Sequence, residues 1–235
     1  LMGNRVIVYP DAGPNQRLLQ YRPNEQITFD DLYNLQNKLT DARYVAPRFF
    51  GKAYITNGKK DRYLSVDGIS LEVEDEEAFR TIKGRTFSEA ARKGLVFECL
   101  LTQSAMNYFQ IDLDAKPIIG INADRYTVVG IVPDPPEADP RFQERVVLPY
   151  FLTQLHWGQT GTISNIVVSW DGPQKMESTI QKLRAALDEC RAPDAYYLSS
   201  SQFKIKKRKG IVSNFMTFGT AQSLFCILVA AIGVV

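Results

Sequence analysis

The only histidine of the chain is the first residue that could take part in catalysis. His156 stands in the stretch QLHWG, so a histidine-based catalytic triad would depend on it alone. Histidines also serve as packing or surface groups, and this second role is the one we expect here.

An acidic cluster at residues 74–77, in LEVEDEEAF, is a second candidate site, because grouped carboxylates can bind a cation. The run lacks the spaced ligands and the glycine of an EF-hand loop. We therefore expect a solvated helix start, where negative charge is favourable, rather than a cation site. The glycines of GINADRYTVVGIV do not have the spacing of a phosphate-binding loop. We therefore expect no catalytic, metal-binding or cofactor-binding residue, and no cofactor.

The cysteines give no sign of a metal site or a disulfide scaffold. Cys99, Cys190 and Cys226 are widely spaced and odd in number, which fits neither paired metal ligands nor a set of bridges. We expect buried thiols, with a bridge between Cys99 and Cys190 as the alternative.

Positive charge is concentrated near the end of the sequence. The 235 residues carry a formal net charge of +2, and five basic residues lie together at 204–209. Without that run the rest of the chain would be slightly acidic, so nucleic acid is not an expected partner. The start, LMGNRVIVYP, lacks the pattern of a secretory signal peptide. The chain is then either cytosolic or a segment of a longer protein, and its end within an apolar run favours the second.

The elements that would position these groups begin with a strand, a helix and a hairpin. Residues 5–9 are rich in β-branched side chains, as a strand should be. Thr28 and Asp31 have the spacing of a capping box, and apolar residues at helical intervals follow them. Residues 48–56 and 61–66 are predicted to form a hairpin, because an Asn-Gly turn lies between them.

The middle of the chain is predicted to be mostly β. Short strands are expected at 95–100, 117–122, 126–132 and 145–150, and the second and third of these are expected to form a hairpin around Ala123-Asp124. One helix is expected over residues 102–109, with Thr102 as its N-cap. The four prolines of PDPPEADP, at 133–140, require an irregular and exposed loop.

The last folded block has the order strand, helix, strand, at 162–170, 174–190 and 195–200. We therefore predict an α+β fold with two subdomains. An α+β lobe is assembled from residues 1–65 and 161–203, and a mostly β lobe of residues 66–160 is inserted into it. Residues 204–235 follow as a basic stalk and the start of a transmembrane helix.

The predicted span depends on residues 210–235, which contain no charged side chain. About 20 apolar residues suffice to cross a bilayer, and the end, SLFCILVAAIGVV, is apolar on every side. Semi-polar residues in the first half of the segment leave a buried soluble helix as the alternative. The basic run does not decide the orientation, because long domains translocate largely regardless of charge. It is either a solvated stalk or a contact for anionic lipid or a partner.

Several motifs occur in a definite order from residue 82 onward. KGRTFSEAA contains a Gly-Arg-x-Phe motif, with Gly84, Arg85 and Phe87. Five further stretches follow in order: FECLLTQSAMNYF, AKPIIGINADRYTVVGIVPD, VVLPY, NIVVSW and LVAAIGVV. The most specific match is YTVVGIV, within the second of these stretches. In this order the motifs resemble the periplasmic core domain of MacB-type ABC transporter permeases. Two departures stand out: the family's Pro-x-Gly-Lys turn keeps only Lys116, and the loop at 133–144 is individual to this chain.

The resemblance implies a non-catalytic domain between the first and second spans of a permease in the bacterial inner membrane, facing the periplasm. Such permeases act as dimers that pass ATP-driven motion from the cytoplasm to the periplasm, for export or mechanotransmission. The implied partners are a second permease subunit, an ATP-binding subunit or domain and membrane lipid, and a periplasmic adaptor protein is left open. The alternative is a single-span sensor or adhesion ectodomain without an ATPase partner.

Overall fold

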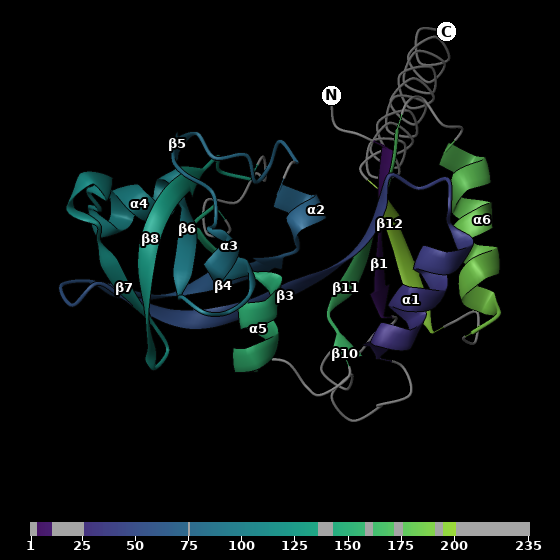
Figure 1. The fold of residues 1–235 in the computed structure, drawn as a ribbon, viewed down its shortest axis with the longest axis horizontal. Coiled ribbons are helices and arrows are strands. Elements are labelled where there is room, and N and C mark those ends of the chain that lie inside the picture. The colour runs from purple at the N-terminus through teal and green to yellow at the C-terminus, as the bar shows by residue number, and fades with distance from the viewer. Residues whose placement is uncertain are drawn as a thin grey trace, which may run out of the picture. The chain divides into compact units, whose positions relative to one another are not determined.

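The computed structural model describes residues 4–10, 26–74, 76–135, 143–157, 162–171, 176–190 and 195–200 (Figure 1). The strands are β1 (Asn4–Pro10), β2 (Ile27–Thr28), β3 (Tyr44–Thr56), β4 (Asp61–Ile69), β5 (Lys83–Gly84), β6 (Glu98–Thr102), β7 (Ile118–Ile121), β8 (Asp124–Val132), β9 (Arg145–Pro149), β10 (Thr162–Ile163), β11 (Asn165–Trp170) and β12 (Tyr196–Ser200). The helices are α1 (Phe29–Lys38), α2 (Leu71–Glu74), α3 (Glu89–Arg92), α4 (Gln103–Phe109), α5 (Tyr150–Trp157) and α6 (Met176–Asp188), and Leu113–Ala115 form a 3₁₀ turn. Ten of the strands form one mixed sheet, so the predicted α+β class is confirmed.

One part of this sheet is covered by two helices, and we call it the helix-backed half. Its strand order is β12-β1-β11-β3, with β11 antiparallel to both of its neighbours. In chain order it reads β1, α1, β3, β11, α6, β12, which is the split β-α-β pattern. Val8 of β1, Leu35 of α1 and Leu183 of α6 are fully or almost fully buried in its core. Figure 1 shows α1 and α6 side by side against these strands.

Helix α1, one of the two helices that cover this half, begins as the sequence predicts. The hydroxyl of Thr28 accepts a hydrogen bond from the backbone N–H of Asp31, and the Asp31 carboxylate accepts one from the backbone N–H of Thr28 at 2.6 Å. This reciprocal pair is a capping box, which satisfies two otherwise unpaired donors at the start of α1. Leu32, Leu35 and Leu39 then lie on the buried face.

The remaining strands close into a ring, which we call the barrel half. From β3 the ladder passes to β4, β9, β6 and β8, and β7 pairs with both β8 and β3. The last link is short: Ile121 lies opposite Ile55, and Gly120 lies opposite Thr56. A closed ring of strands has no free edge, and its inward side chains fill the interior. β5 pairs with β8 beyond the end of β7.

A third core lies outside this ring. The first residues after β4, from α2 to Phe79, pack together with Phe87 and Ala91 of the α3 region. They cover Ala46 and Ile69, which belong to β3 and β4. Because β3 also pairs with β11, this third core lies where the two halves meet.

Several predicted elements are confirmed, and two details are wrong. Both hairpins form, and the second turns at Asn122, whose φ is +53°. The strand expected from residue 95 begins only at Glu98. Thr102 precedes α4 as predicted but makes no side-chain cap; its hydroxyl instead accepts a 2.8 Å hydrogen bond from the backbone N–H of Arg145. The cap comes from Asp134, whose carboxylate accepts the backbone N–H of Ser104 at 2.8 Å.

Some predictions fall on residues outside the described ranges. They include the basic stalk and transmembrane segment at 204–235 and most of the Pro-rich loop at 133–144. In the part of the chain that is described, none of the helices has the length and apolar character needed to span a bilayer. The boundaries of the predicted lobes, 1–65, 66–160 and 161–203, stay a prediction.

Candidate functional site

The Gly-Arg-x-Phe motif forms the first part of a polar network on the outer side of the barrel half. Gly84 has a φ of +82°, and a Cβ at this position would lie 2.5 Å from the carbonyl oxygen of Val129. Only glycine tolerates both the backbone conformation and this close approach to β8. Phe87 is buried in the third core. Between these two anchors, the backbone holds Arg85 toward β6.

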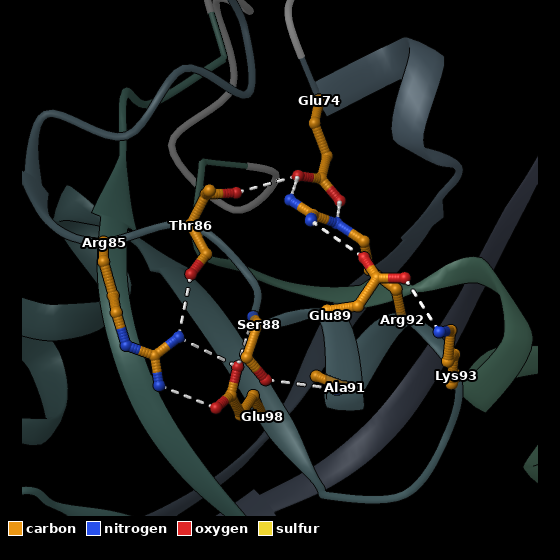
Figure 2. Close-up of polar contacts among 9 residues, drawn as sticks. All are labelled: Glu74, Arg85, Thr86, Ser88, Glu89, Ala91, Arg92, Lys93 and Glu98. Carbon is orange, nitrogen blue, oxygen red and sulfur yellow. Dashed lines mark hydrogen bonds and ion pairs between the residues drawn. The ribbon is translucent and has the colours of Figure 1, made fainter.

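Arg85 binds a buried carboxylate at the start of that strand. Its guanidinium donates to both oxygens of Glu98, at 2.6 and 3.1 Å, and the backbone N–H of Ser88 donates to one of them at 2.8 Å (Figure 2). Burial raises the pKa of Glu98, but the hydrogen bonds from Arg85 and Ser88 more than offset it and hold that pKa below its usual value. Ser88 in turn caps α3 by accepting the N–H of Ala91 at 3.1 Å.

A second buried carboxylate completes the network. Glu74, at the end of α2, accepts hydrogen bonds from the guanidinium of Arg92 at 2.8 and 3.1 Å and from the hydroxyl of Thr86 at 2.9 Å. Figure 2 shows Arg92 and Thr86 converging on this carboxylate from α3 and from the motif. Exposed Glu89 pairs with Lys93 at 3.2 Å and, at 3.8 Å, with the outer side of the Arg92 guanidinium (Figure 2).

These contacts correct the interpretation of the acidic cluster at 74–77 as a solvated helix start. Glu74 ends a helix rather than beginning one, and its side chain is 7% exposed. Glu76 also lies in an ion pair, with Arg5 of β1. Among the described residues, no group of three or more histidine, cysteine, aspartate or glutamate side chains could hold a metal ion. Arg92 and Arg5 pair with the carboxylates of Glu74 and Glu76.

His156 lies on α5 in an aromatic environment. Its Nδ1 is 3.1 Å from a carboxylate oxygen of Asp124. The rings of Phe97, Tyr126 and Trp157 surround it with centroid distances of 5.6, 6.1 and 5.7 Å. Two members of a triad are thus in contact, but three aromatic rings surround the imidazole where a substrate would need access. The geometry favours the packing role expected for His156.

The cysteines are only partly as predicted. Cys99 is completely buried in the barrel core, and burial raises the pKa of its thiol. Cys190 is exposed rather than buried, because it lies just beyond the last turn of α6. Both are free thiols, so the alternative of a bridge between them is wrong. Cys226 lies outside the described residues.

Sequence reasoning missed one buried ionic group, which lies where β3 passes from one half to the other. The Asp67 carboxylate is fully buried and accepts the guanidinium of Arg48 at 2.7 Å and that of Arg145 at 3.2 Å. Burial disfavours the charged form of Arg48, yet the carboxylate of Asp67 keeps its pKa above the ordinary value. The hint in the sequence was that Arg48 and Arg145 each begin a predicted β segment, at 48–56 and 145–150. A charge that becomes buried there is costly unless it is paired.

Comparisons with known proteins agree with this architecture. A family model described as the MacB-like periplasmic core domain matches residues 1–186. The macrolide export ATP-binding/permease protein MacB of Bdellovibrio bacteriovorus is 27% identical over 126 residues, which make up 53% of this chain and 19% of that protein. The match therefore spans about a fifth of the length of this curated relative.

Two solved structures share the fold. The periplasmic region of MacB from Actinobacillus actinomycetemcomitans superposes with a TM-score of 0.70 at 16% identity, covering 89% of this chain and 94% of that one. The extracellular domain of the noncanonic ABC-type transporter YknZ from Gram-positive bacteria gives a TM-score of 0.61 at 14% identity, covering 83% and 100%. Together with the family match, these likenesses confirm the resemblance predicted from the motifs: the chain belongs to the family of MacB-like periplasmic core domains of ABC transporter permeases.

Proposed function

We propose that this chain is a mechanical domain of an ABC transporter permease, which passes ATP-driven motion from the membrane to the periplasm for export or mechanotransmission. The observation that carries the proposal is the path of β3. Its residues Tyr44 to Arg48 pair with β11, and Arg48 to Thr56 pair with β4. Since ladder hydrogen bonds extend along the whole strand, a displacement of one half is transmitted to the other.

The placement of the first and last strands supports the same function. β1 and β12 are neighbours in the helix-backed half. β11 and β12 are joined through α6, and such a crossover returns the chain to the end where it started, so β12 runs parallel to β11. β1 is antiparallel to β11. The chain therefore enters β1 and leaves β12 at the same end of the sheet, as two connections to one membrane would require.

Within this proposal the helix-backed half stands for the predicted α+β lobe of residues 1–65 and 161–203, and the barrel half for the inserted lobe of residues 66–160. The hairpin of β3 and β4 departs from those bounds, because Ala53, Ile55 and Leu64 lie in the barrel core. Residues 204–235 form the basic stalk and the start of the second span. The partners are a second copy of the permease, an ATP-binding subunit or domain and membrane lipid, and a periplasmic adaptor is a further candidate. We expect no catalysis by the domain itself, and the pairing of the buried carboxylates of Glu98 and Glu74 with Arg85 and Arg92 supports this.

The test follows the distance between two copies of the domain during ATP turnover. A nitroxide is attached to Lys59→Cys, in the exposed turn between β3 and β4, in a full-length permease with Cys190 and Cys226 changed to serine. The permease is reconstituted with its ATPase in nanodiscs. We expect the interspin distance to differ between the nucleotide-free and vanadate-trapped states, and an inactive ATPase to abolish the change.

An interspin distance that stays the same in all nucleotide states would refute mechanical transmission. A protein that purifies without an ATPase and yields no second spin within range would instead support the single-span sensor or adhesion ectodomain.

A further inference from the structure

A short segment after β4 contacts both halves of the molecule. We call residues 71–74 and 76–79 the junction segment. Val73 and Phe79 are buried in the third core together with Ala46 of β3 and Ile69 of β4. These apolar contacts anchor the segment beside the strand that joins the halves, where neighbouring polar side chains can reach in both directions.

Glu74 reaches toward the barrel half. Its carboxylate is bound by Arg92 of α3 and Thr86 of the Gly-Arg-x-Phe motif, as Figure 2 shows. The motif is itself fixed to the barrel, because Gly84 pairs with Gly130 of β8. The first carboxylate of the junction segment is thus tied to the barrel wall through two independent donors.

Glu76, only two residues later, reaches toward the helix-backed half. One carboxylate oxygen accepts a hydrogen bond from the guanidinium of Arg5 on β1, and the other accepts one from the phenol of Tyr44 on β3. Burial, followed by the nearby Glu76 carboxylate, raises the pKa of Tyr44, so its hydroxyl remains a donor. Glu76 itself is mostly buried, with a side chain 13% exposed. A charge-assisted hydrogen bond in such a place is stronger than one at the surface.

Arg48 of β3 is the residue at which the two ladders meet. Arg48 is opposite Asn165 of β11 and also opposite Ile69 of β4. Its guanidinium lies 5.0 Å from the centre of the Phe79 ring, which belongs to the junction segment. Among the described strands, β3 alone forms ladder pairs with both halves. A single strand can twist and bend, so it does not by itself fix the angle between the two halves.

We propose that the junction segment is an electrostatic clamp, in which Glu74 holds the barrel half and Glu76 holds the helix-backed half and thereby sets the angle between them. The clamp uses the acidic cluster for a role that is neither metal binding nor helix capping. Weakening either end releases one half from the segment while each half keeps its own core, because the first core and the barrel core do not include the junction segment.

The clamp is tested by measuring one distance across the halves and one within a half, in the full-length protein with Cys226 changed to serine. Exposed Cys190, after α6, provides a natural labelling position in the helix-backed half, and buried Cys99 does not react. Lys59→Cys provides the second label in the barrel half. For the distance within the helix-backed half, Lys59 is left unchanged and the second label is placed at Asp171→Cys, an exposed position after β11. Pulsed electron paramagnetic resonance then reads both distances.

Glu76→Gln and Arg5→Gln should each shift and broaden the distance between the halves and leave the distance within the helix-backed half unchanged. The matched control is Glu144→Gln, because Glu144 is also ion-paired, at 2.7 Å, but with Arg62 of the same half. If the two clamp variants leave the distance between halves as narrow as in the control, the clamp does not exist. The proposal is equally overturned if the distance within the half broadens to the same extent, because Glu76 then serves the fold of that half rather than the angle.

Discussion

The substitution Glu98→Gln tests whether the polar network of the motif stabilises the barrel half. It removes the negative charge that receives three hydrogen bonds, two from Arg85 and one from the Ser88 backbone. Gln keeps one oxygen acceptor, but its NH₂ group faces guanidinium donors with which it cannot bond. The two partners differ in burial: the side chain of Glu98 is 9% exposed, whereas that of Arg85 is 55% exposed. The guanidinium can therefore be rehydrated when the ion pair is lost.

The size of the effect follows from this asymmetry. Breaking a fully buried ion pair costs about 3–5 kcal/mol, because a charge is left without a partner. Here the exposed guanidinium returns to water, so the cost is closer to that of losing one or two hydrogen bonds to a charged group, about 2 kcal/mol. For a chain of this size, that loss lowers the Tm by about 4–8 °C.

The effect should depend on pH in one direction. The pKa of Glu98 is lower in the folded protein than in the unfolded chain. Its contribution is therefore fully present above the unfolded pKa of about 4.3 and is lost as the pH falls through the folded value. The difference in stability between wild type and Glu98→Gln should be constant from neutral pH down to about pH 5 and shrink below pH 4.

The two tryptophans provide a readout for each half. Trp157 packs against the barrel core, and Trp170 lies in the core of the helix-backed half. In a Trp170→Phe background the remaining fluorescence of Trp157 follows the thermal unfolding of the barrel half. In a Trp157→Phe background the fluorescence of Trp170 follows the helix-backed half. Glu89→Gln is the control, because Glu89 is 70% exposed and its pairs with Lys93 and Arg92 each contribute about 1 kcal/mol at most. A Glu98→Gln Tm within about 1 °C of that control, or an undiminished difference at pH 3.5, would show that the charge of Glu98 does not stabilise the barrel half.

Three further outcomes follow from the same contacts. Thr28→Ala should destabilise the helix-backed half by about 1 kcal/mol in the same melts, and Thr28→Ser should restore it, since serine can accept the same cap bond. A thiol reagent should modify exposed Cys190 in the native protein and reach buried Cys99 only on unfolding; equal rates would contradict the described burial. Gly68→Ala should cost about 1–3 kcal/mol, because the new Cβ would lie 2.2 Å from the hydroxyl of Thr153, and adding Thr153→Ala should recover part of that loss.

Features that depend on neighbouring residues were predictable from the sequence. Thr28 and Asp31 are three positions apart, so their capping box could be recognised without knowing the fold. The turn between β7 and β8 was located in a similar way, from the two β segments on either side of Ala123-Asp124, and the structure has Asn122 at a positive φ there. In both cases every interacting group lies within a few residues.

Helix α5 was not predicted, because its sequence lacks the usual signals. YFLTQLHW follows Pro149 directly and shows no capping side chain. Phe151 and Leu155 are exposed, whereas Leu152 is fully buried, so apolar residues occur on both sides of the helix. A polar face, which would have revealed the helical period, is missing from the pattern.

The acidic cluster was misinterpreted because its partners are remote. Arg92 lies 18 positions after Glu74, and Arg5 lies 71 positions before Glu76. A run of carboxylates read alone looks solvated, and only the tertiary fold brings in the opposite charges. The resemblance drew attention to Gly84, Arg85 and Phe87, but it did not reveal that the motif supplies a donor to Glu74.

The closure of the barrel explains why the junction is the place where motion should appear. A ring of six strands has no free edge, and Tyr126 and Phe109 fill its interior as almost fully buried side chains. Deforming the ring would break ladder hydrogen bonds and open cavities, which is costly. The helix-backed half has its own packed core. Among the described strands only β3 pairs with both halves. A displacement entering through β1 and β12 should therefore turn the barrel half as one body about β3 and strain the contacts of Glu76.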